Sequence, residues 1–397
     1  MKHAMPVLAA LSVLVAAPAW AQAPAPEKAP SITSNQGPGG RAITSFDRRA
    51  QSRVGGYFDN EFSLPLDGKD STFRQHRLIL QASSYLHENL FFNTEIEYEY
   101  GGQINANTKD GELKIEQAWA DYRINDALSL RGGVVLVPFG IVNVLHDSDV
   151  RETTNRPLMA DKVVPSTWMD TGAGFHGFVY PTEDMQVSYE AYVTNGLSDK
   201  ISADKGLKDA RPSFKKDNNG NKAVSGRLSV SPWLGLDLGL SGYRGVYDAN
   251  RNLSMLGADT TLSLGPVEIL GEYANVQSEG GTFAADATQP TVLTSIPGTM
   301  EGYYVEGRYR FFPEILHGTF MGREGGFPQA SMALVGRYGQ ASTDKANPGT
   351  KNDQTEYLVG LNYRPIQTFV TKLEYQRLAD PIGGNKDAIW SSIAVGF

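Results

Sequence analysis

The residues best suited to chemistry lie together in one polar stretch, FGIVNVLHDSDVRETTNRPLMADKVVPSTW, which runs from Phe139 to Trp168. Its candidate residues are His146, Asp147, Asp149, Arg151, Glu152, Arg156, Asp161 and Lys162. Charges of both signs in so short a stretch can create an electric field across a narrow passage and sort solutes. The same charges can instead tie a loop to a protein wall through ion pairs. Both interpretations stay open from the sequence.

We interpret this stretch as a loop because nearly thirty consecutive residues show no helix or strand periodicity. Loops of that length are mostly functional or disordered. Here Val142, Leu158 and Val163 supply enough apolar surface to pack, and Pro138 and Pro165 fix the two ends. We therefore predict an ordered loop over residues 139–167 that folds inward and constricts a lumen.

Segments of about ten residues with alternating apolar and polar side chains occur from residue 53 onward, as in transmembrane β-strands. Since successive side chains of a strand point to opposite faces, each segment has one face for lipid and one for water. The candidate residues for a water-filled wall are Glu95, Glu97, Glu99, Glu306, Arg308, Arg310, Lys372 and Glu374.

The segments number roughly sixteen, and short turns alternate with longer connections between them. This pattern predicts an all-β fold, a transmembrane antiparallel β-barrel of about 16 strands, in which residues 139–167 form the third external loop. Residues 313–328 occupy the place of a short turn but are longer, and their role is not predicted.

The chain ends carry targeting signals. Residues 1–21 have a positive start, a short apolar run and the small-x-small ending of a signal peptide. Residues 22–50 are rich in Pro, Ala and Gly and are predicted to form a flexible periplasmic segment. Residues 51–397 are predicted to form the barrel. The final alternating segment ends on Phe397 and resembles the C-terminal strand of outer-membrane barrels. We expect the outer membrane of a Gram-negative bacterium, with lipid and lipopolysaccharide around the barrel.

Composition excludes several other classes. The chain has no cysteine and a net charge of −8, so we expect neither a cysteine-bound metal nor nucleic-acid binding. His76, His87, His176 and His317 lack the spacing of a metal site, and we predict no catalytic, cofactor or metal residue. The alternative class is a secreted or barrel-embedded β-protein that binds or hydrolyses a ligand, with His146 as a base.

Six motifs carry a family resemblance: FRQHRLIL (73–80), TEIEYEYGG (94–102), IEQAWADY (115–122), LRGGVVLVPFGIVN (130–143), HDSDVRETTNRP (146–157) and VPSTWMDTGAGFHG (164–177). In their joint order the chain resembles the outer-membrane porins named for the phosphate-selective porins O and P. The resemblance implies a sixteen-stranded homotrimer with an inward third loop. It does not extend to phosphate specificity. The phosphate binders of that family line the pore with rows of arginine and a lysine cluster, whereas this chain is acidic and only Arg308 and Arg310 make a comparable inward pair.

The function that we expect from these features is passive diffusion of small hydrophilic solutes and ions through a water-filled porin channel, without a cofactor. The seven ionised candidates between Asp147 and Lys162 sum to a charge of −1. Because the narrowest point dominates permeation, we predict a weak cation preference, or none, and no tight anion site.

Overall fold

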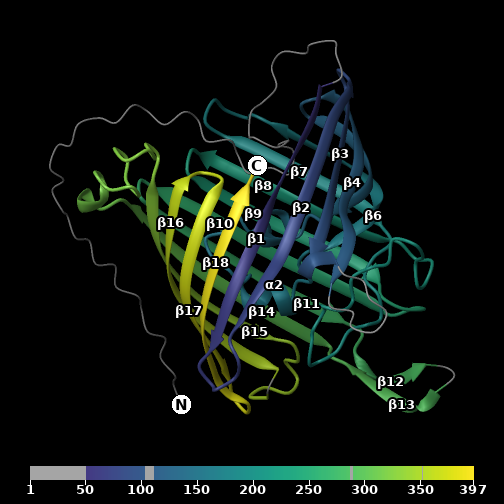
Figure 1. The fold of residues 1–397 in the computed structure, drawn as a ribbon. Helices are drawn as coiled ribbons and strands as arrows, with labels where there is room; N and C mark the ends of the chain where they lie inside the picture. Colours follow the sequence, from purple (N-terminus) through teal and green to yellow (C-terminus); the bar gives the residue numbers. More distant parts are fainter. Residues whose placement is uncertain (1–50, 103–110, 287–288, 351) are drawn as a thin grey trace, which may run out of the picture. The chain divides into compact units, whose positions relative to one another are not determined.

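The computed structural model describes residues 51–102, 111–286, 289–350 and 352–397. The predicted signal peptide (1–21) and the predicted flexible segment (22–50) lie outside these ranges. Most of the described chain is β-strand (Figure 1). In the described part of the chain, no helix has the length and apolar character needed to cross a membrane.

Sixteen strands of the described residues form one closed barrel, and their order around the ring follows the chain. They are β1 (Gln51–Pro65), β2 (Thr72–His87), β3 (Leu90–Glu99), β4 (Glu112–Asn125), β5 (Leu128–Leu136), β6 (Met169–Val179), β7 (Gln186–Thr194), β8 (Ala223–Trp233), β9 (Leu236–Val246), β10 (Asn252–Leu264), β11 (Val267–Ser278), β14 (Thr299–Phe311), β15 (Ser331–Ser342), β16 (Asp353–Ile366), β17 (Phe369–Asp380) and β18 (Gly384–Gly396). The predicted fold class and strand number are confirmed.

The remaining elements are short. They are the 3-10 helices η1 (Tyr100–Gly102) and η2 (Glu314–Leu316), the helices α1 (Ile141–Val144) and α2 (Leu158–Lys162), and the strands β12 (Gly281–Asp286) and β13 (Gln289–Ile296). β12 and β13 pair only with each other and form a separate two-stranded sheet. The sequence pattern did not predict this hairpin.

The first and last strands close the ring. β1 pairs with β18 in an antiparallel register that places Tyr57 opposite Gly396. The amide of Phe397 donates to the carbonyl of Gly56 at 2.9 Å, and the amide of Gly56 donates to the carbonyl of Phe397 at 3.1 Å. A closed sheet leaves no edge with unpaired backbone groups, as a membrane-spanning sheet requires.

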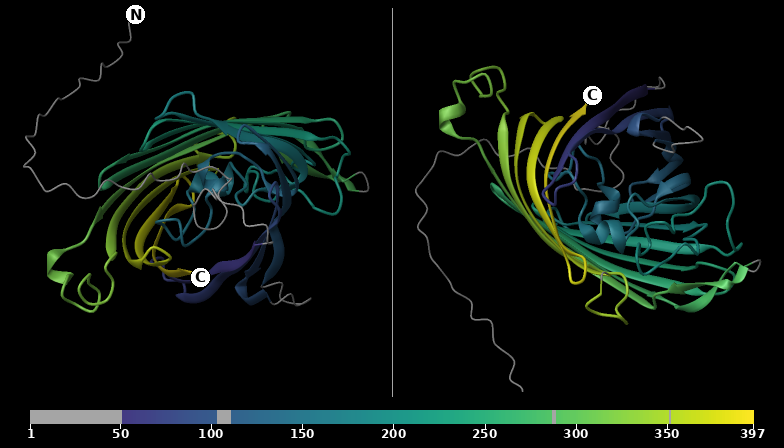
Figure 2. Two further views of the ribbon diagram at one scale, coloured as in Figure 1. Left: turned by 90° about the horizontal axis from the view of Figure 1, so that it is seen from above. Right: turned by 60° about the horizontal axis from the view of Figure 1, so that its bottom comes forward.

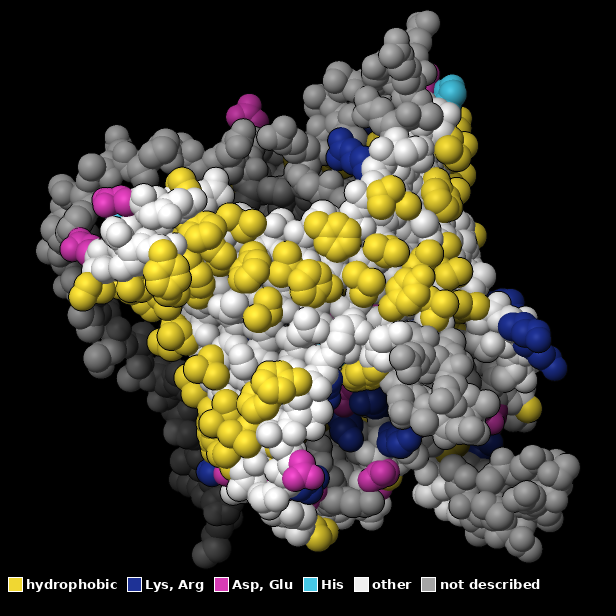
Figure 3. All heavy atoms as spheres, viewed as in Figure 1, with side chains coloured by type: hydrophobic (Ala, Val, Ile, Leu, Met, Phe, Trp, Pro, Cys, Tyr) yellow, Lys and Arg dark blue, Asp and Glu magenta, His cyan; other side chains and the backbone are white. Residues whose placement is uncertain are grey.

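Side-chain alternation separates the two faces of the sheet. On β16, Glu356 and Asn362 are fully buried, whereas Val359 is 51% exposed. The exposed residues of this and other strands are mainly apolar, and Figure 3 shows hydrophobic side chains spread across the outer surface of the strands. The predicted division into an apolar and a charged face is therefore confirmed.

Tight turns connect many strand pairs where the sequence predicts them. Leu264 lies opposite Val267 in the register of β10 and β11, so only Gly265 and Pro266 make the turn. Gly265 has a φ of 59°, a left-handed conformation that glycine adopts without strain.

The long connection 313–328 has a fixed base and an exposed apolar surface. The hydroxyl of Tyr363 donates to the carbonyl of Met321 at 2.6 Å, and the Arg323 guanidinium lies over the Phe312 ring. Ile315 and Phe320 are largely exposed.

Candidate functional site

The segment from residue 137 to residue 168, here called the long loop, connects β5 to β6 and has a hydrogen-bonded base. The side-chain amide of Asn143 donates to the carbonyls of Val137 and Trp168, at 2.8 and 3.1 Å. Its side-chain oxygen accepts from the amide of Trp168 at 2.6 Å. One buried side chain thus holds the two ends of the loop together.

Apolar packing fixes one side of the long loop against the barrel. Phe139, Met159 and Trp168 are fully buried in a cluster with strand residues that include Tyr243, and the Trp168 and Tyr243 ring centroids lie 4.9 Å apart. A Cβ on Gly257 of β10 would come within 2.9 Å of the Phe139 ring. Because Gly257 has no side chain, the Phe139 ring of the loop can pack against β10 at this position.

Charged side chains of the barrel fix the other side of the loop. Glu152 accepts from Arg364 Nε at 3.1 Å and from Asn362 Nδ2 at 2.8 Å, and it pairs with Arg310 at 2.9 Å. These three partners belong to β16 and β14. The surrounding arginines lower the pKa of Glu152 to about 2 despite its burial, which acts in the opposite direction.

Charged strand residues also satisfy the backbone of the loop. Lys372 donates to the carbonyl of Ser148 at 2.7 Å, and Arg364 donates to the carbonyl of Asp149 at 2.8 Å. In return, Glu374 accepts from the amide of Thr154 at 2.6 Å. Outside α1 and α2 the loop has no regular structure, and its buried backbone groups there need such partners.

Three strands spaced around the ring bind the loop. His146 Nε2 lies 3.2 Å from Glu116 Oε2 on β4, and the Val142 amide donates to Glu272 on β11 at 3.1 Å. The Thr154 contact with Glu374 lies on β17. In Figure 2 the blue ribbon of this segment appears within the ring of strands.

Arg151 organises the loop internally. Its guanidinium donates to the carbonyl of His146 at 3.0 Å and to the carbonyl of Thr154 at 2.9 Å. Burial and the nearby Arg77 lower its pKa. Arg156 donates to the Thr167 hydroxyl at 2.9 Å, and burial together with Arg77 lowers its pKa to about 9.

Two predicted acids keep access to water. The side chain of Asp147 is 27% exposed and lies 3.6 Å from His146 Nε2. Asp149 is partly exposed and directly precedes Val150, which is exposed. Burial and the neighbouring Asp147 raise the pKa of Asp149 to about 6.

The last two predicted loop residues face a different neighbour. Asp161 pairs with Lys208 at 2.8 Å, and Lys162 Nζ donates to the carbonyl of Asp204 at 3.4 Å. The carbonyl of Lys162 also accepts from the amide of Leu207. These contacts attach the end of α2 to the connection between β7 and β8, away from the other six candidates.

The predicted wall residues occupy the polar face of the strands and form ion pairs there. Glu97 and Glu99 pair with Arg77 at 3.1 and 3.3 Å, and Lys114 also contacts Glu97. Glu306 lies between Arg308 and Arg337, at 2.7 and 2.9 Å. Figure 3 shows basic and acidic side chains together in a hollow below the hydrophobic surface.

Sequence reasoning missed Asp59, Glu61, Glu116 and Arg337, which are all buried on the same polar face. Arg337 contacts Glu306, Glu356 and the loop carbonyl of Asn155. The signal was available for Asp59 and Glu61, because in YFDNEF they lie two positions apart between Phe58 and Phe62, which point to the opposite face.

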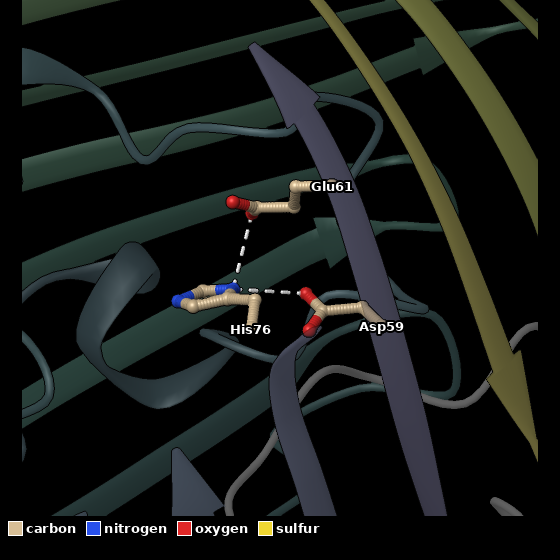
Figure 4. A group of neighbouring side chains, drawn as sticks. All are labelled: Asp59, Glu61 and His76. Atoms are coloured by element: carbon tan, nitrogen blue, oxygen red, sulfur yellow. Dashed lines mark hydrogen bonds and ion pairs between the residues drawn. The ribbon is translucent and has the colours of Figure 1, made fainter. Parts of the chain in front are cut away.

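Among the residues that the structure describes, two groups of side chains have the donor types of a metal site. In the first group, His76 Nδ1 lies 3.1 Å from Asp59 Oδ2 and 3.0 Å from Glu61 Oε1 (Figure 4). The second group comprises Glu95, Glu116 and His146. Each group draws its members from different elements, so sequence spacing did not indicate them.

A closed barrel of sixteen antiparallel strands in the described ranges, apolar outside and charged inside, is the architecture of an outer-membrane porin, a channel for small solutes in Gram-negative bacteria. Residues 49–283 match the family of phosphate-selective porin O and P. This match covers more than half of the 397 residues, and the chain belongs to that family. The family and the fold are those of a channel rather than an enzyme.

The chain is also similar to an uncharacterised protein of Aquifex aeolicus (strain VF5), with 35% identity over 180 residues that make up 45% of this chain and 39% of the relative. It thus spans less than half the length of that relative. A Salmonella typhi OmpF in complex with daunomycin shares the fold at a TM-score of 0.56 and 12% identity, covering 87% of this chain and 97% of the OmpF chain. An anion-selective porin from Comamonas acidovorans has a TM-score of 0.54 and 11% identity, covering 88% of this chain and 100% of its own.

A third similar structure is the trimer form of OmpT, an outer-membrane protein of Vibrio cholerae. It has a TM-score of 0.54 and 10% identity, and the match covers 88% of this chain and 99% of that chain.

Proposed function

We propose that the long loop enters the lumen and forms the narrowest part of a water-filled diffusion channel for small hydrophilic solutes and ions. The observation that carries this proposal is the set of bonds from one loop to Glu116 on β4, Glu272 on β11 and Glu374 on β17. A segment that reaches three distant parts of a closed ring has to cross its interior. No cofactor, energy source or catalytic step belongs to this proposal.

The buried charges of the loop give the constriction a fixed position. Glu152, Arg151 and His146 are buried and bonded to the wall or to the loop itself. A loop held in this way leaves a lumen of constant width. Between His146 and Glu152, the titratable side chains that keep partial access to water are Asp147 and Asp149, and both are acidic, which supports a weak cation preference.

The bonding of the wall cations argues against a tight phosphate site. Phosphate recognition uses several convergent arginine or lysine donors. Arg308 is already paired with Glu268 and Glu306, and Arg310 is paired with Glu152. An incoming phosphate would have to displace these carboxylates, so we propose that phosphate passes as an ordinary solute.

Single-channel recording tests the constriction. Deletion of residues 144–160 should raise the conductance, because it removes the protein that fills the lumen. Deletion of 346–349, which lie in an exposed connection between β15 and β16, is the matched control and should leave the conductance near its original value. An unchanged conductance after the first deletion would place the constriction elsewhere.

Reversal potentials across a salt gradient test the selectivity of the intact channel. We expect a reversal potential that is near zero or that indicates a slight preference for cations. Strong anion selectivity, or block by micromolar phosphate, would contradict it.

We also propose that three copies assemble into a homotrimer whose apolar surfaces contact outer-membrane lipid and lipopolysaccharide. Support comes from the family and from the trimeric OmpT that shares the fold. Chemical crosslinking in intact membranes should give a species of three chains, whereas single chains alone would exclude the trimer.

A further inference from the structure

A compact group of acidic side chains surrounds His146 at the point where the long loop meets β3 and β4. The ligand-type atoms of Glu95, Glu116 and His146 all lie within 4.8 Å of one another. The three residues are buried, with exposed fractions of 1%, 0% and 2%. Asp147 approaches the same imidazole at 3.6 Å.

The hydrogen bonds of His146 leave one ring nitrogen facing the acids. Its Nδ1 lies 3.1 Å from the backbone carbonyl of Asn143. A carbonyl only accepts, so Nδ1 carries the hydrogen, and in the neutral imidazole the lone pair of Nε2 points at Glu116 Oε2, 3.2 Å away. Two lone pairs facing each other require a cation between them. Nδ1 bonding to a backbone carbonyl is also the arrangement that orients metal-binding histidines.

Each of the three carboxylates around His146 has one oxygen without a hydrogen-bond donor. Glu95 Oε1, Glu116 Oε1 and Asp147 Oδ1 are buried without a hydrogen-bond partner. Glu95 Oε2 accepts from Gln117 at 2.7 Å, and Gln81 also lies beside this carboxylate. Among the described residues, no lysine or arginine forms an ion pair with any of these three acids.

The other charged groups nearby do not remove this excess of negative charge. Glu97 and Arg77 also lie close to Glu116. Arg77 and Lys114 are both ion-paired with Glu97 and with Glu99. Arg77, Lys114 and Arg156 interact with Glu116 and offset part of its charge. A proton on His146 would neutralise a further part, but Glu95 would stay buried with amide donors and without an ion pair, which is costly in free energy.

The group of Asp59, Glu61 and His76 provides the contrast within the same barrel. It has the same donor types (Figure 4), but its carboxylates have protein donors. Glu61 accepts from Arg74 at 2.7 Å, and Asp59 accepts from the backbone amide of Arg77 at 2.9 Å. A protonated His76 completes this group, so it needs no further cation.

We propose that Glu95, Glu116 and His146 bind a divalent transition-metal ion, with Zn²⁺ as the fitting probe, and that the ion joins the long loop to β3 and β4. Zinc accepts imidazole and carboxylate ligands at about 2.1 Å, which sets ligand atoms about 3.4 Å apart in a tetrahedral site. The 3.2 Å between His146 and Glu116 is close to that spacing. Asp147 is positioned to act as the fourth ligand. The proposal does not depend on what passes through the channel.

Metal titration of the purified full-length protein tests the site. After chelator treatment, calorimetric titration with ZnCl₂ at neutral pH should show one ion bound per chain. Glu116→Gln keeps the size of the side chain but removes its charge, and it should weaken binding roughly 100-fold, the upper end of what loss of even an orienting partner costs. Glu61→Gln, in the Asp59, Glu61 and His76 group, is the matched control and should bind Zn²⁺ like the original protein.

Cobalt gives a second readout that does not use affinity. Co²⁺ in the site should produce visible absorption bands, which His146→Ala should abolish or shift. Heat-modifiable gel mobility checks that each variant is folded, and Glu95→Gln replaces Glu116→Gln if the latter does not fold. Absence of a bound ion in the original protein, equal affinity in Glu116→Gln, or loss of binding in Glu61→Gln would each overturn the proposal.

Discussion

Glu152 shows how single residues of this channel act. Its carboxylate binds Arg364, Arg310 and Asn362 and is 1% exposed. A charge in that position holds the loop to the wall and has little contact with passing solutes. Under the proposed function, the charges that act on solutes belong to less buried residues such as Asp147 and Asp149.

Glu152→Gln removes the negative partner of two arginines. We expect the free energy of unfolding to fall by about 3–5 kcal/mol, because breaking a buried ion pair leaves uncompensated charge. Urea unfolding in lipid vesicles measures this loss. Asp161→Asn is the control, since the pair of Asp161 with Lys208 is largely exposed and such pairs contribute about 1 kcal/mol or less. Equal losses in the two variants would contradict the assigned role of Glu152.

The pKa of Glu152 also gives this stabilisation a pH dependence. In the folded protein the pKa is about 2, below its ordinary value of 4.5. A lowered pKa means that the stabilisation is complete above about pH 4.5 and is lost as the pH falls toward 2. Stability measured between pH 2 and pH 6 should therefore depend on pH less in Glu152→Gln than in the original protein.

Asp149 should make the selectivity depend on pH. Because its pKa is raised to about 6, the carboxyl is mostly neutral at pH 5 and charged at pH 7.5. The same raised pKa means that this residue favours the folded state less as the pH rises through 6. We expect the reversal potential to move toward cation preference between these two pH values, and Asp149→Asn to remove most of that change. A pH response of equal size in the variant would assign the effect to another group.

At the scale of elements, the sequence predicted the strands better than the contacts of the loop. Alternation placed Glu306, Lys372 and Glu374 on the charged face, because a period of two residues fixes the face of every side chain in a strand. The loop has no period, so nothing in its sequence tells which strand each residue meets. The pairing of Glu152 with β16 and of His146 with β4 arises only when the sheet closes.

Two further segments could not be placed from the sequence pattern. They are the hairpin of β12 and β13 and the long connection 313–328. The hairpin stands outside the barrel sheet and breaks the spacing on which strand counting relies. The spacing of the barrel strands therefore did not predict the hairpin and did not assign a role to residues 313–328.

Substitution of Gly140 can test how closely the long loop packs against β11. It has a φ of 70°, and a Cβ at this position would come within 1.8 Å of Glu272 Oε1. Gly140→Ala should displace the start of the loop, lower the stability and increase fluctuations of the open-channel current. Gly336→Ala on β15 is the matched control, because no atom lies within 4 Å of its added Cβ. A quiet channel in both variants would mean that the loop adjusts without strain.

At the scale of the whole barrel, closure of the ring can be tested with cysteines, because the chain has none of its own. Phe58 lies opposite Val395 across the pair of β1 and β18, and opposed residues of antiparallel strands lie about 4.5–5.5 Å apart, within reach of a disulfide. The double variant F58C/V395C should form this bond and keep a compact gel mobility after heating until it is reduced. F58C/A394C places the two thiols on opposite faces and should not crosslink. Failure of the first pair would contradict the register.

The junction of β1 and β18 also orders the folding of the chain in time. It joins positions 57 and 396, so β18 has to be synthesised before it can pair with β1. Contacts of such high contact order form slowly, and until they form, both end strands present unpaired backbone groups that can bind another chain. The interval before closure is therefore the period of greatest aggregation risk, and a protein that holds the unfolded chain during transport would act mainly in that interval.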